Sequence, residues 1–207
     1  MITMIDYGGS NLRSAQKAFE FIGAEVLVTE KPEDVLRASK LVLPGVGAFG
    51  AGMAALRARG LIEPIREAVR QGIPLLGICV GMQFLFDVSE EMGEYEGLGV
   101  LSGRVVRFPE GALKVPHMGW NELVVDRPHP LLWGVPAGAY TYFVHSYHCQ
   151  TASPAAVVAH TDYGQPVAAI VNEGNVYGIQ FHPEKSHRVG LQIINNYVTR
   201  IPAFSAG

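Results

Sequence analysis

The stretch Pro74-Leu75-Leu76-Gly77-Ile78-Cys79-Val80-Gly81-Met82-Gln83 places a cysteine between two glycines at the end of an apolar run. Residues 74–78 predict a buried strand, and residues 80–87 predict a helix that begins directly behind the cysteine. The pattern G-x-C-x-G is typical of a nucleophile elbow, with sulfur in place of oxygen. The glycines fit an elbow because its tight turn leaves no space for a Cβ atom on either side. The alternative for Cys79 is a buried thiol that packs as a small hydrophobic side chain.

Strands and helices alternate in the part of the chain that precedes this stretch. We expect strands at residues 2–6, 25–29 and 40–43, and helices at residues 11–22, 32–38, 52–58 and 61–71. Apolar strands that alternate with helices indicate a parallel sheet that is covered on both faces. Ligands of such a sheet gather beyond the carboxyl ends of its strands, which is where Cys79 would lie.

The second half of the chain is predicted to contain short strands in place of alternating strands and helices. Short predicted strands separated by Gly, Pro and Asn turns follow at residues 103–108, 139–144, 155–159, 167–171 and 176–181. A last amphipathic helix is expected at residues 188–198. The sequence therefore predicts a single domain over residues 1–207, with a three-layer α/β fold whose mostly parallel sheet carries an antiparallel extension.

Composition narrows the function classes. A formal net charge of −3 and a charged fraction of 17% give the chain no basic surface for nucleic acid. No run of about 18 apolar residues is present, so we expect no membrane partner. The first six residues lack the basic segment of a signal peptide, and the two cysteines are expected to stay reduced. These features predict a cytoplasmic protein.

A candidate base follows another apolar strand, in Gln180-Phe181-His182-Pro183-Glu184. Pro183 disfavours helical geometry at His182, so we expect an extended chain that points His182 and Glu184 to the same side. Glu184 would then hold the imidazole as the acid of a triad does, and His182 would serve the thiol as its base. The alternatives are a histidine that closes a strand and a solvated carboxylate.

Glycines also follow a third strand, in Leu43-Pro44-Gly45-Val46-Gly47-Ala48-Phe49-Gly50. Exposed backbone N–H groups there could cradle a phosphate, but the stretch lacks the Lys-Ser/Thr of a P-loop. Beside a nucleophile, such N–H groups suit an oxyanion hole. A plain turn is the alternative, because glycine and proline favour turns unaided.

The remaining histidines give weaker signals. His145-Ser146-Tyr147-His148-Cys149 superficially resembles a set of metal ligands, but no second cluster with zinc spacing accompanies it. We therefore expect no metal and no cofactor, and we expect Cys149 to belong to the core. His117 lies in Lys114-Val115-Pro116-His117-Met118-Gly119-Trp120-Asn121, which we expect to form a polar and aromatic loop.

Together, Gly77–Gln83, Gln180–Glu184 and Pro44–Gly47 resemble the class I (triad) glutamine amidotransferases, which have a flavodoxin-like fold. Further stretches narrow the resemblance to the glutaminase subunits of imidazole glycerol phosphate synthase, in histidine biosynthesis: Asp6-Tyr7-Gly8, Asn11-Leu12-Arg13-Ser14, Pro116–Asn121, Tyr142–Tyr147 and Lys185-Ser186. The resemblance runs from residue 6 to about residue 200. The chain departs from it at Gly9-Ser10, where the family usually has a glycine before the asparagine.

The resemblance implies an enzyme that hydrolyses glutamine to glutamate and ammonia through a Cys-His-Glu triad. Cys79 would attack the side-chain amide carbon of glutamine. His182 would give its proton to the leaving ammonia and then activate water against the thioester, while Glu184 holds the ring. Backbone N–H groups of Val80 and of the Val46 region would bind the oxyanion. The implied glutamine-pocket residues are Gly45, Gly47, Gln83, His145, Ser146 and Tyr147.

The resemblance also implies a partner. Because the predicted glutaminase core uses all 207 residues, we expect a second protein to consume the ammonia. The family's partner is a (β/α)₈-barrel cyclase that forms a heterodimer with the glutaminase. Trp120, Asn121 and Lys185 are the candidates for the docking face, and a solvated charge is the alternative for Lys185. Glycines on both sides of Val46 would let its peptide flip, so we expect the partner to switch the glutaminase on.

Two other classes stay open. A glutaminase subunit of another ammonia-using synthase, of the vitamin B6 or anthranilate type, would share the triad but would lack Pro-His-Met-Gly-Trp-Asn. A catalytically silent binding module would lack a member of the triad, whereas this sequence has all three.

Overall fold

The computed structural model describes residues 1–9, 11–111 and 113–205, so Ser10 of the Gly9-Ser10 departure lies outside it. Its centre is an eight-stranded sheet. The strands in spatial order are β2 (Val26–Thr29), β1 (Ile2–Ile5), β3 (Leu41–Gly45), β4 (Leu75–Cys79), β14 (Val176–Ile179), β13 (Pro166–Glu173), β12 (Val157–Asp162) and β9 (Val124–Val125). The first five are parallel, and β13, β12 and β9 continue the sheet with antiparallel pairing.

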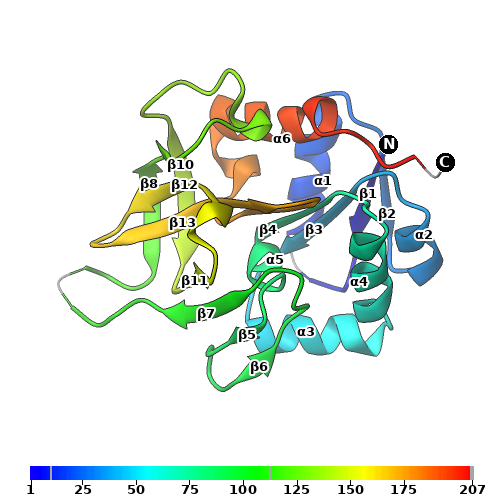
Figure 1. Cartoon of the computed structure of the whole chain (residues 1–207), viewed down its shortest axis with the longest axis horizontal. Helices are drawn as coiled ribbons and strands as arrows, with labels where there is room; N and C mark the ends of the chain where they lie inside the picture. The colour runs from blue at the N-terminus through cyan, green and yellow to red at the C-terminus, as the bar shows by residue number, and fades with distance from the viewer. Residues whose placement is uncertain (10, 112, 206–207) are drawn as a thin grey trace.

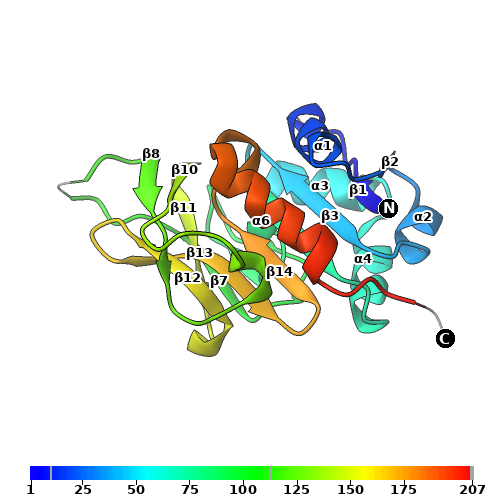
Figure 2. The same ribbon diagram turned by 90° about the horizontal axis from the view of Figure 1, so that it is seen from above.

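Helices cover both faces of this sheet, as Figures 1 and 2 show. The helices are α1 (Leu12–Phe21), α2 (Pro32–Leu36), α3 (Phe49–Ala58), α4 (Ile62–Arg70), α5 (Val80–Gln83) and α6 (His187–Arg200). α1 and α6 lie on one face, and α2, α3 and α4 lie on the other (Figure 1). The parallel strands are apolar because helices bury both of their faces. Each fully buried aliphatic side chain contributes roughly 1.5–3 kcal/mol to stability.

Two smaller sheets complete the fold. One pairs β8 (His117–Glu122) with β10 (Tyr140–His145), and the other orders β11 (Tyr147–Thr151), β7 (Gly103–Arg107), β5 (Val88–Ser89) and β6 (Tyr95–Glu96). Short 3₁₀ helices lie at η1 (Pro130–Leu132), η2 (Pro154–Ala156) and η3 (Pro183–Lys185). The prediction of a three-layer, mostly parallel α/β sheet with an antiparallel extension is confirmed. No helix in the described part of the chain combines the length and apolarity that a membrane crossing requires.

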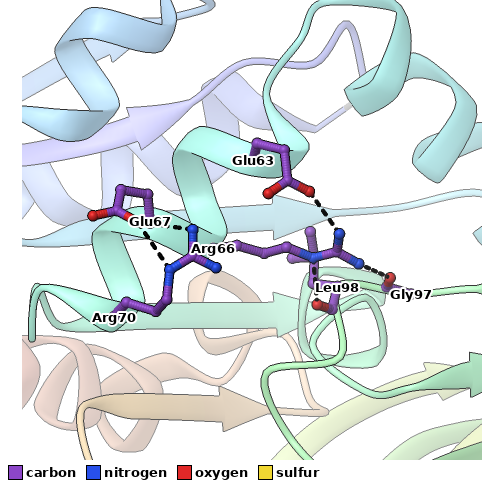
Figure 3. Close-up of polar contacts among 6 residues, drawn as sticks. All are labelled: Glu63, Arg66, Glu67, Arg70, Gly97 and Leu98. Carbon is purple, nitrogen blue, oxygen red and sulfur yellow. Dashed lines mark hydrogen bonds and ion pairs between the residues drawn. The ribbon is translucent and has the colours of Figure 1, made fainter.

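Arg66 of α4 ties a helix of the main layer to the loop after β6. Its Nε donates to the Leu98 carbonyl at 2.9 Å and its Nη2 donates to the Gly97 carbonyl at 3.3 Å, while Nη1 pairs with Glu63 at 2.7 Å (Figure 3). The neighbouring Arg70–Glu67 pair on the same helix is solvent-exposed. Arg66 thus holds the segment that follows β6 against helix α4.

Two local predictions are wrong, and a third needs adjustment. The helix expected at residues 80–87 ends at Gln83, because the next carbonyls bind a different segment: Phe84 accepts from the Leu98 N–H at 2.7 Å, and Leu85 accepts from Val100 at 2.9 Å. The loop expected around His117 is strand β8. Finally, the strand expected at residues 155–159 begins as η2 and becomes β12 only at Val157.

Candidate active site

Cys79 ends β4 and starts α5 with a backbone that few side chains adopt. Its φ is 56° and its ψ is −115°, a strained region that costs roughly 1–3 kcal/mol. A Cβ atom on Gly77 would lie 2.6 Å from the Gly81 carbonyl oxygen, and one on Gly81 would overlap the Leu43 carbonyl of β3. The flanking glycines therefore let the elbow pack directly against the neighbouring strand, and this packing keeps the strained conformation in place.

His182 and Glu184 form a buried pair at the end of β14. The His182 Nδ1 lies 2.8 Å from the Glu184 Oε1, with both side chains almost fully enclosed. The chain between them is the 3₁₀ helix η3 and not an extended segment as the sequence predicts, although His182 itself is extended, with φ −92° and ψ 99°. The turn begins at Pro183, whose fixed φ suits the first position of a helix.

The environment keeps the imidazole protonated. Burial lowers the pKa of His182, but its interactions with the Cys79 side chain and with Glu184 outweigh burial and raise the pKa to about 10. Burial raises the pKa of Glu184, yet hydrogen bonds from His182 and Asn11 hold it below its usual range. The ring is therefore a cation held between the Cys79 sulfur and the Glu184 carboxylate.

Asn11 is a site residue to which sequence reasoning gave no role. Its Nδ2 donates to the Glu184 Oε1 at 2.8 Å, which is the same oxygen that His182 contacts. Asn11 has a left-handed φ of 72° at the start of α1, a conformation that asparagine tolerates better than most residues. Its place in the Asn11–Ser14 motif was the available signal.

A cavity of about 520 Å³ opens in front of Cys79. The predicted residues that line it are Val46, Gly47, Cys79, Val80, Gln83, His145, Ser146, Tyr147, His182 and Lys185. Gly45, Trp120 and Asn121 do not line it, and Glu184 lies behind His182. Gly45 instead packs beneath the elbow, because a Cβ atom there would overlap the Gly81 backbone nitrogen.

Glu91 also lines the cavity and was missed from the sequence. Its Oε2 accepts from the Phe49 N–H at 2.6 Å, at the start of α3. No motif surrounds Glu91, and only the folding of the β5–β6 hairpin onto α3 brings it there. It gives the cavity a carboxylate in addition to the residues 144–147 that also line it.

Polar groups fix the wall on the far side of the cavity. The buried Gln83 amide donates to the Tyr147 carbonyl at 3.0 Å and to the Gln180 Oε1 at 3.2 Å. The His145 Nδ1 also contacts the Tyr147 carbonyl, at 2.9 Å. The i+4 spacing that the sequence places between Cys79 and Gln83 spans one turn of α5, so both side chains reach the same cavity.

The backbone of Val46 has a specific neighbour. Burial raises the pKa of Tyr7 to about 12, while the approach of the Val46 N–H opposes this rise. The Tyr7 hydroxyl nevertheless makes no well-formed hydrogen bond within the described residues. Tyr7 does not line the 520 Å³ cavity. The Val46 N–H therefore approaches a side chain that does not line the cavity.

Trp120 and Lys185 of the predicted docking residues lie near an exposed patch, whereas Asn121 points to the opposite face of β8 from Trp120 and contacts His117. Trp120 of β8 is 45% exposed and stacks on His187 with ring centroids 4.9 Å apart. Lys185 lies over the Tyr142 ring, with its Nζ 5.9 Å from the centroid. Met118, two residues before Trp120 on the same face of β8, is 61% exposed. β8 and β10 thus present apolar side chains beside the entrance to the cavity.

The stretch His145–Cys149, which superficially resembles a set of metal ligands, does not form a metal site. Within residues 1–9, 11–111 and 113–205, no group of three or more His, Cys, Asp or Glu side chains is arranged to hold a metal ion. Cys149 is buried on β11, and burial raises its thiol pKa well above the usual range. Both cysteines are free.

Comparisons with known proteins agree with this geometry. The family described as glutamine amidotransferase class-I matches residues 3–201. The chain is 50% identical over 197 residues to the imidazole glycerol phosphate synthase subunit HisH of Desulfitobacterium hafniense strain Y51, covering 95% of this chain and 93% of that protein. It is 51% identical over 203 residues to the HisH subunit of Syntrophotalea carbinolica, covering 95% and 98% respectively.

Among solved structures, PurLQS from Thermotoga maritima matches with a TM-score of 0.75 at 23% identity, over 97% of this chain and 98% of that chain. That likeness concerns the fold, which agrees with the predicted flavodoxin-like architecture. The sequence match is what decides the family, since it spans nearly the whole length of both proteins. The chain therefore belongs to the class I glutamine amidotransferases.

Proposed function

We propose that this chain is the glutaminase subunit of an imidazole glycerol phosphate synthase, in histidine biosynthesis. It hydrolyses glutamine and passes ammonia to a separate cyclase, and residues 1–207 act as one glutaminase domain. The observation that carries the proposal is the buried His182–Glu184 pair, 2.8 Å apart, beside Cys79 and a cavity of about 520 Å³. Identities of 50% and 51% to HisH subunits support this choice among the ammonia-using synthases.

The chemistry begins at the elbow. The Cys79 thiol passes its proton to His182, and the sulfur then attacks the side-chain amide carbon of glutamine and forms a tetrahedral intermediate. His182, held as a cation, gives its proton to the leaving nitrogen, so that ammonia departs and a thioester remains. The neutral ring then takes a proton from water, which attacks the thioester and releases glutamate. Glu184 holds the ring throughout, and Asn11 holds Glu184.

Glutamine recognition uses the polar groups that line the cavity. The Glu91 carboxylate is placed to pair with the α-ammonium group of the substrate. His145, Ser146 and Tyr147 form a wall whose backbone N–H groups suit the α-carboxylate. The substrate would then lie with its amide towards Cys79.

Two backbone N–H groups would hold the oxyanion. The Val80 N–H lies at the start of α5, directly after the nucleophile. The second donor is the Val46 N–H, which faces Tyr7 and so must turn towards the cavity. Because one such donor accelerates the reaction by about 10²- to 10³-fold, the isolated chain should be slow and a bound cyclase should restore that factor.

The partner is a (β/α)₈-barrel cyclase that docks over Trp120, Asn121 and Lys185 to form a heterodimer. The exposed apolar side chains of this face support that assignment, since apolar and aromatic residues are enriched at interface cores. Ammonia released at Cys79 would cross the interface without entering the solvent.

The decisive experiment combines the chain with a barrel cyclase and its nucleotide substrate. Cys79→Ser should reduce glutamine-driven synthesis by roughly four to six orders of magnitude, while synthesis from added ammonium continues. Cys149→Ala is the matched control and should leave both reactions near wild type. Glutamine hydrolysis that persists in Cys79→Ser would overturn the assignment of the nucleophile.

A further inference from the structure

We infer that a chain of hydrogen bonds from Asn121 through His117 and His145 to the Tyr147 carbonyl holds the glutamine-binding wall in position and links it to the docking face. His117 and His145 are thus positioning residues that act through Tyr147. This inference rests on the proposed function, because it assigns these residues to the binding of glutamine and not to the chemical step.

The direction of each hydrogen bond follows from its acceptor. The His145 Nδ1 lies 2.9 Å from the Tyr147 carbonyl, which only accepts, so Nδ1 carries the proton. The His145 Nε2 of a neutral ring then accepts, and the His117 Nδ1, 3.0 Å away, donates to it. The His117 Nε2 in turn accepts from the Asn121 Nδ2 at 3.2 Å. Both rings are therefore neutral Nδ1–H tautomers.

Burial favours this neutral arrangement. Burial lowers the pKa of His145 to about 3 and that of His117 to about 4. The Asn121 amide has a defined orientation, since its Nδ2 also donates to the Asp162 carbonyl at 2.8 Å and its Oδ1 accepts from the Glu122 N–H at 2.8 Å. Each donor in the chain therefore meets an acceptor, and reversing any one bond would break the next.

Aromatic packing prevents the rings from turning. His117 lies between Phe143, with centroids 4.8 Å apart, and Tyr163, with centroids 4.0 Å apart, and both rings are nearly parallel to it. Phe108 packs against His145 with centroids 5.2 Å apart. Because both faces of the His117 ring are covered, the ring cannot turn, and each of its nitrogens keeps its hydrogen-bond partner.

The last hydrogen bond of the series, from His145 to Tyr147, positions a peptide that faces the substrate. The Phe108 N–H donates to the Ser146 carbonyl at 3.1 Å, and Tyr147 lies opposite Arg107 in the β11–β7 pair. In this register, the N–H and C=O of Tyr147 point away from β7. Gln83 and His145 occupy the carbonyl, which leaves the N–H of Tyr147 for the carboxylate of glutamine.

The outer end lies next to the proposed partner. Asn121 follows Trp120 on β8, and β8 pairs with β10 in a register that sets His117 opposite His145. A partner that moves Asn121 would change the donor to His117 and, through two rigid rings, the position of the Tyr147 peptide. Docking should thus affect the affinity for glutamine as well as the rate.

Two variants at His117 separate a hydrogen-bonding role from a packing role. His117→Phe keeps an aromatic ring between Phe143 and Tyr163 but removes both nitrogens, and it should raise the KM for glutamine by roughly 5- to 50-fold with little change in kcat. His117→Asn replaces the Nδ1–H donor by an amide donor, and it should recover most of that loss. Ammonium-driven synthesis by each complex is the control for folding and docking.

The outcomes distinguish the inference from the proposed function. If the wild-type chain hydrolyses no glutamine with the cyclase present, the proposed function fails. If wild type is active but both variants have a wild-type KM, or share the same raised KM, the inference fails alone. Asn121→Ala, at the partly exposed end, provides a second test that does not disturb the packed rings, and it should raise the KM in the complex.

The same series of hydrogen bonds can be tested by a measurement that needs no enzyme turnover. Nitrogen-15 spectra of the histidine rings in the wild-type protein at neutral pH should show His117 and His145 as Nδ1–H tautomers, with signals assigned through the His117→Asn variant. A Nε2–H tautomer or a charged ring at His145 would overturn the inference, whatever the activity of the enzyme.

Discussion

The two walls of the active-site cavity are built by different means. The elbow wall, at Cys79 and Val80, is supported from behind by Gly45 and Gly81, where backbone packs on backbone without side chains between β3 and β4. The opposite wall, at His145 and Tyr147, is held by side-chain hydrogen bonds. Backbone packing tolerates almost no displacement, whereas a hydrogen-bonded chain can be shifted from its end. In the proposed function, the chemistry takes place at the elbow wall, and the wall at His145 and Tyr147 binds glutamine.

A graded series in the His182–Glu184–Asn11 hydrogen bonds beside the elbow wall should produce the largest effects. His182→Ala should lower kcat by at least about 10³-fold, because it removes the group that moves protons. Glu184→Gln should cost less, since Glu184 orients the ring, and Asn11→Gly should cost least, since it only supports Glu184. Glycine is chosen at position 11 because it accepts the left-handed φ of 72°.

Rates of glutamate release in the cyclase complex check the order of this series. An equal loss from Glu184→Gln and His182→Ala, with folding intact, would give Glu184 a direct chemical role. An Asn11→Gly loss as large as that of Glu184→Gln would make Asn11 more than a support.

Overpacking the elbow should have the next largest effect. A Cβ atom in Gly81→Ala would overlap the Leu43 carbonyl, so the free energy of unfolding should fall by about 3 kcal/mol, with a parallel loss of activity. The matched control is Gly111→Ala, where no atom lies within 4 Å of the added Cβ and little change is expected. Urea unfolding checks both, and a wild-type stability for Gly81→Ala would contradict the rigid-wall interpretation.

Removing the thiol should change the titration of the imidazole. The Cys79 side chain and Glu184 together raise the pKa of His182 to about 10 against the effect of burial. In Cys79→Ala one of these two partners is lost while burial remains, so the pKa should fall and the ring should lose its proton at a lower pH. The chemical shifts of the His182 ring protons across a pH series measure this pKa, with Cys149→Ala as the control. An unchanged pKa would mean that Glu184 alone holds the charge.

The wall at His145 and Tyr147 should give the smallest effect, and a different kind of effect. Gln83→Met removes one of the two donors to the Tyr147 carbonyl, a loss of about 1 kcal/mol that corresponds to a rise in KM of roughly 5-fold. The kcat should stay near wild type. Gln16→Met is the control, because the Gln16 amide meets only Glu20 on the exposed face of α1. A lower kcat with an unchanged KM would place Gln83 on the catalytic side.

The sequence predicts the elbow wall better than the wall at His145 and Tyr147. The elbow around Cys79 and the His182–Glu184 pair are each encoded within a few residues, so strand, turn and spacing reveal them. The link between His117 and His145 depends on the pairing of two strands. The strand that carries His117 also reverses the usual pattern, because polar His117 is buried while apolar Met118 and Trp120 are exposed. Glu91 is equally hidden, because only tertiary folding brings it to Phe49.

Glycine and proline rules also have limits that the structure exposes. Gly45 reads as a pocket residue, but its missing side chain serves the contact with Gly81. Pro183 reads as a residue that keeps the chain extended, but it starts the 3₁₀ turn of η3. The contact that explains Gly45 lies elsewhere in the chain, whereas the turn that Pro183 begins is formed by the residues beside it.

The placement of the two cysteines makes the protein selective towards labelling reagents. Cys79 borders the cavity and faces a cationic ring, while Cys149 is enclosed on β11 with a thiol pKa raised by burial, which keeps it in the unreactive protonated form. An electrophilic glutamine analogue should therefore modify one sulfur per chain. Such a reagent would count functional sites in a preparation, and it would offer a single attachment point for a spectroscopic probe at the cavity.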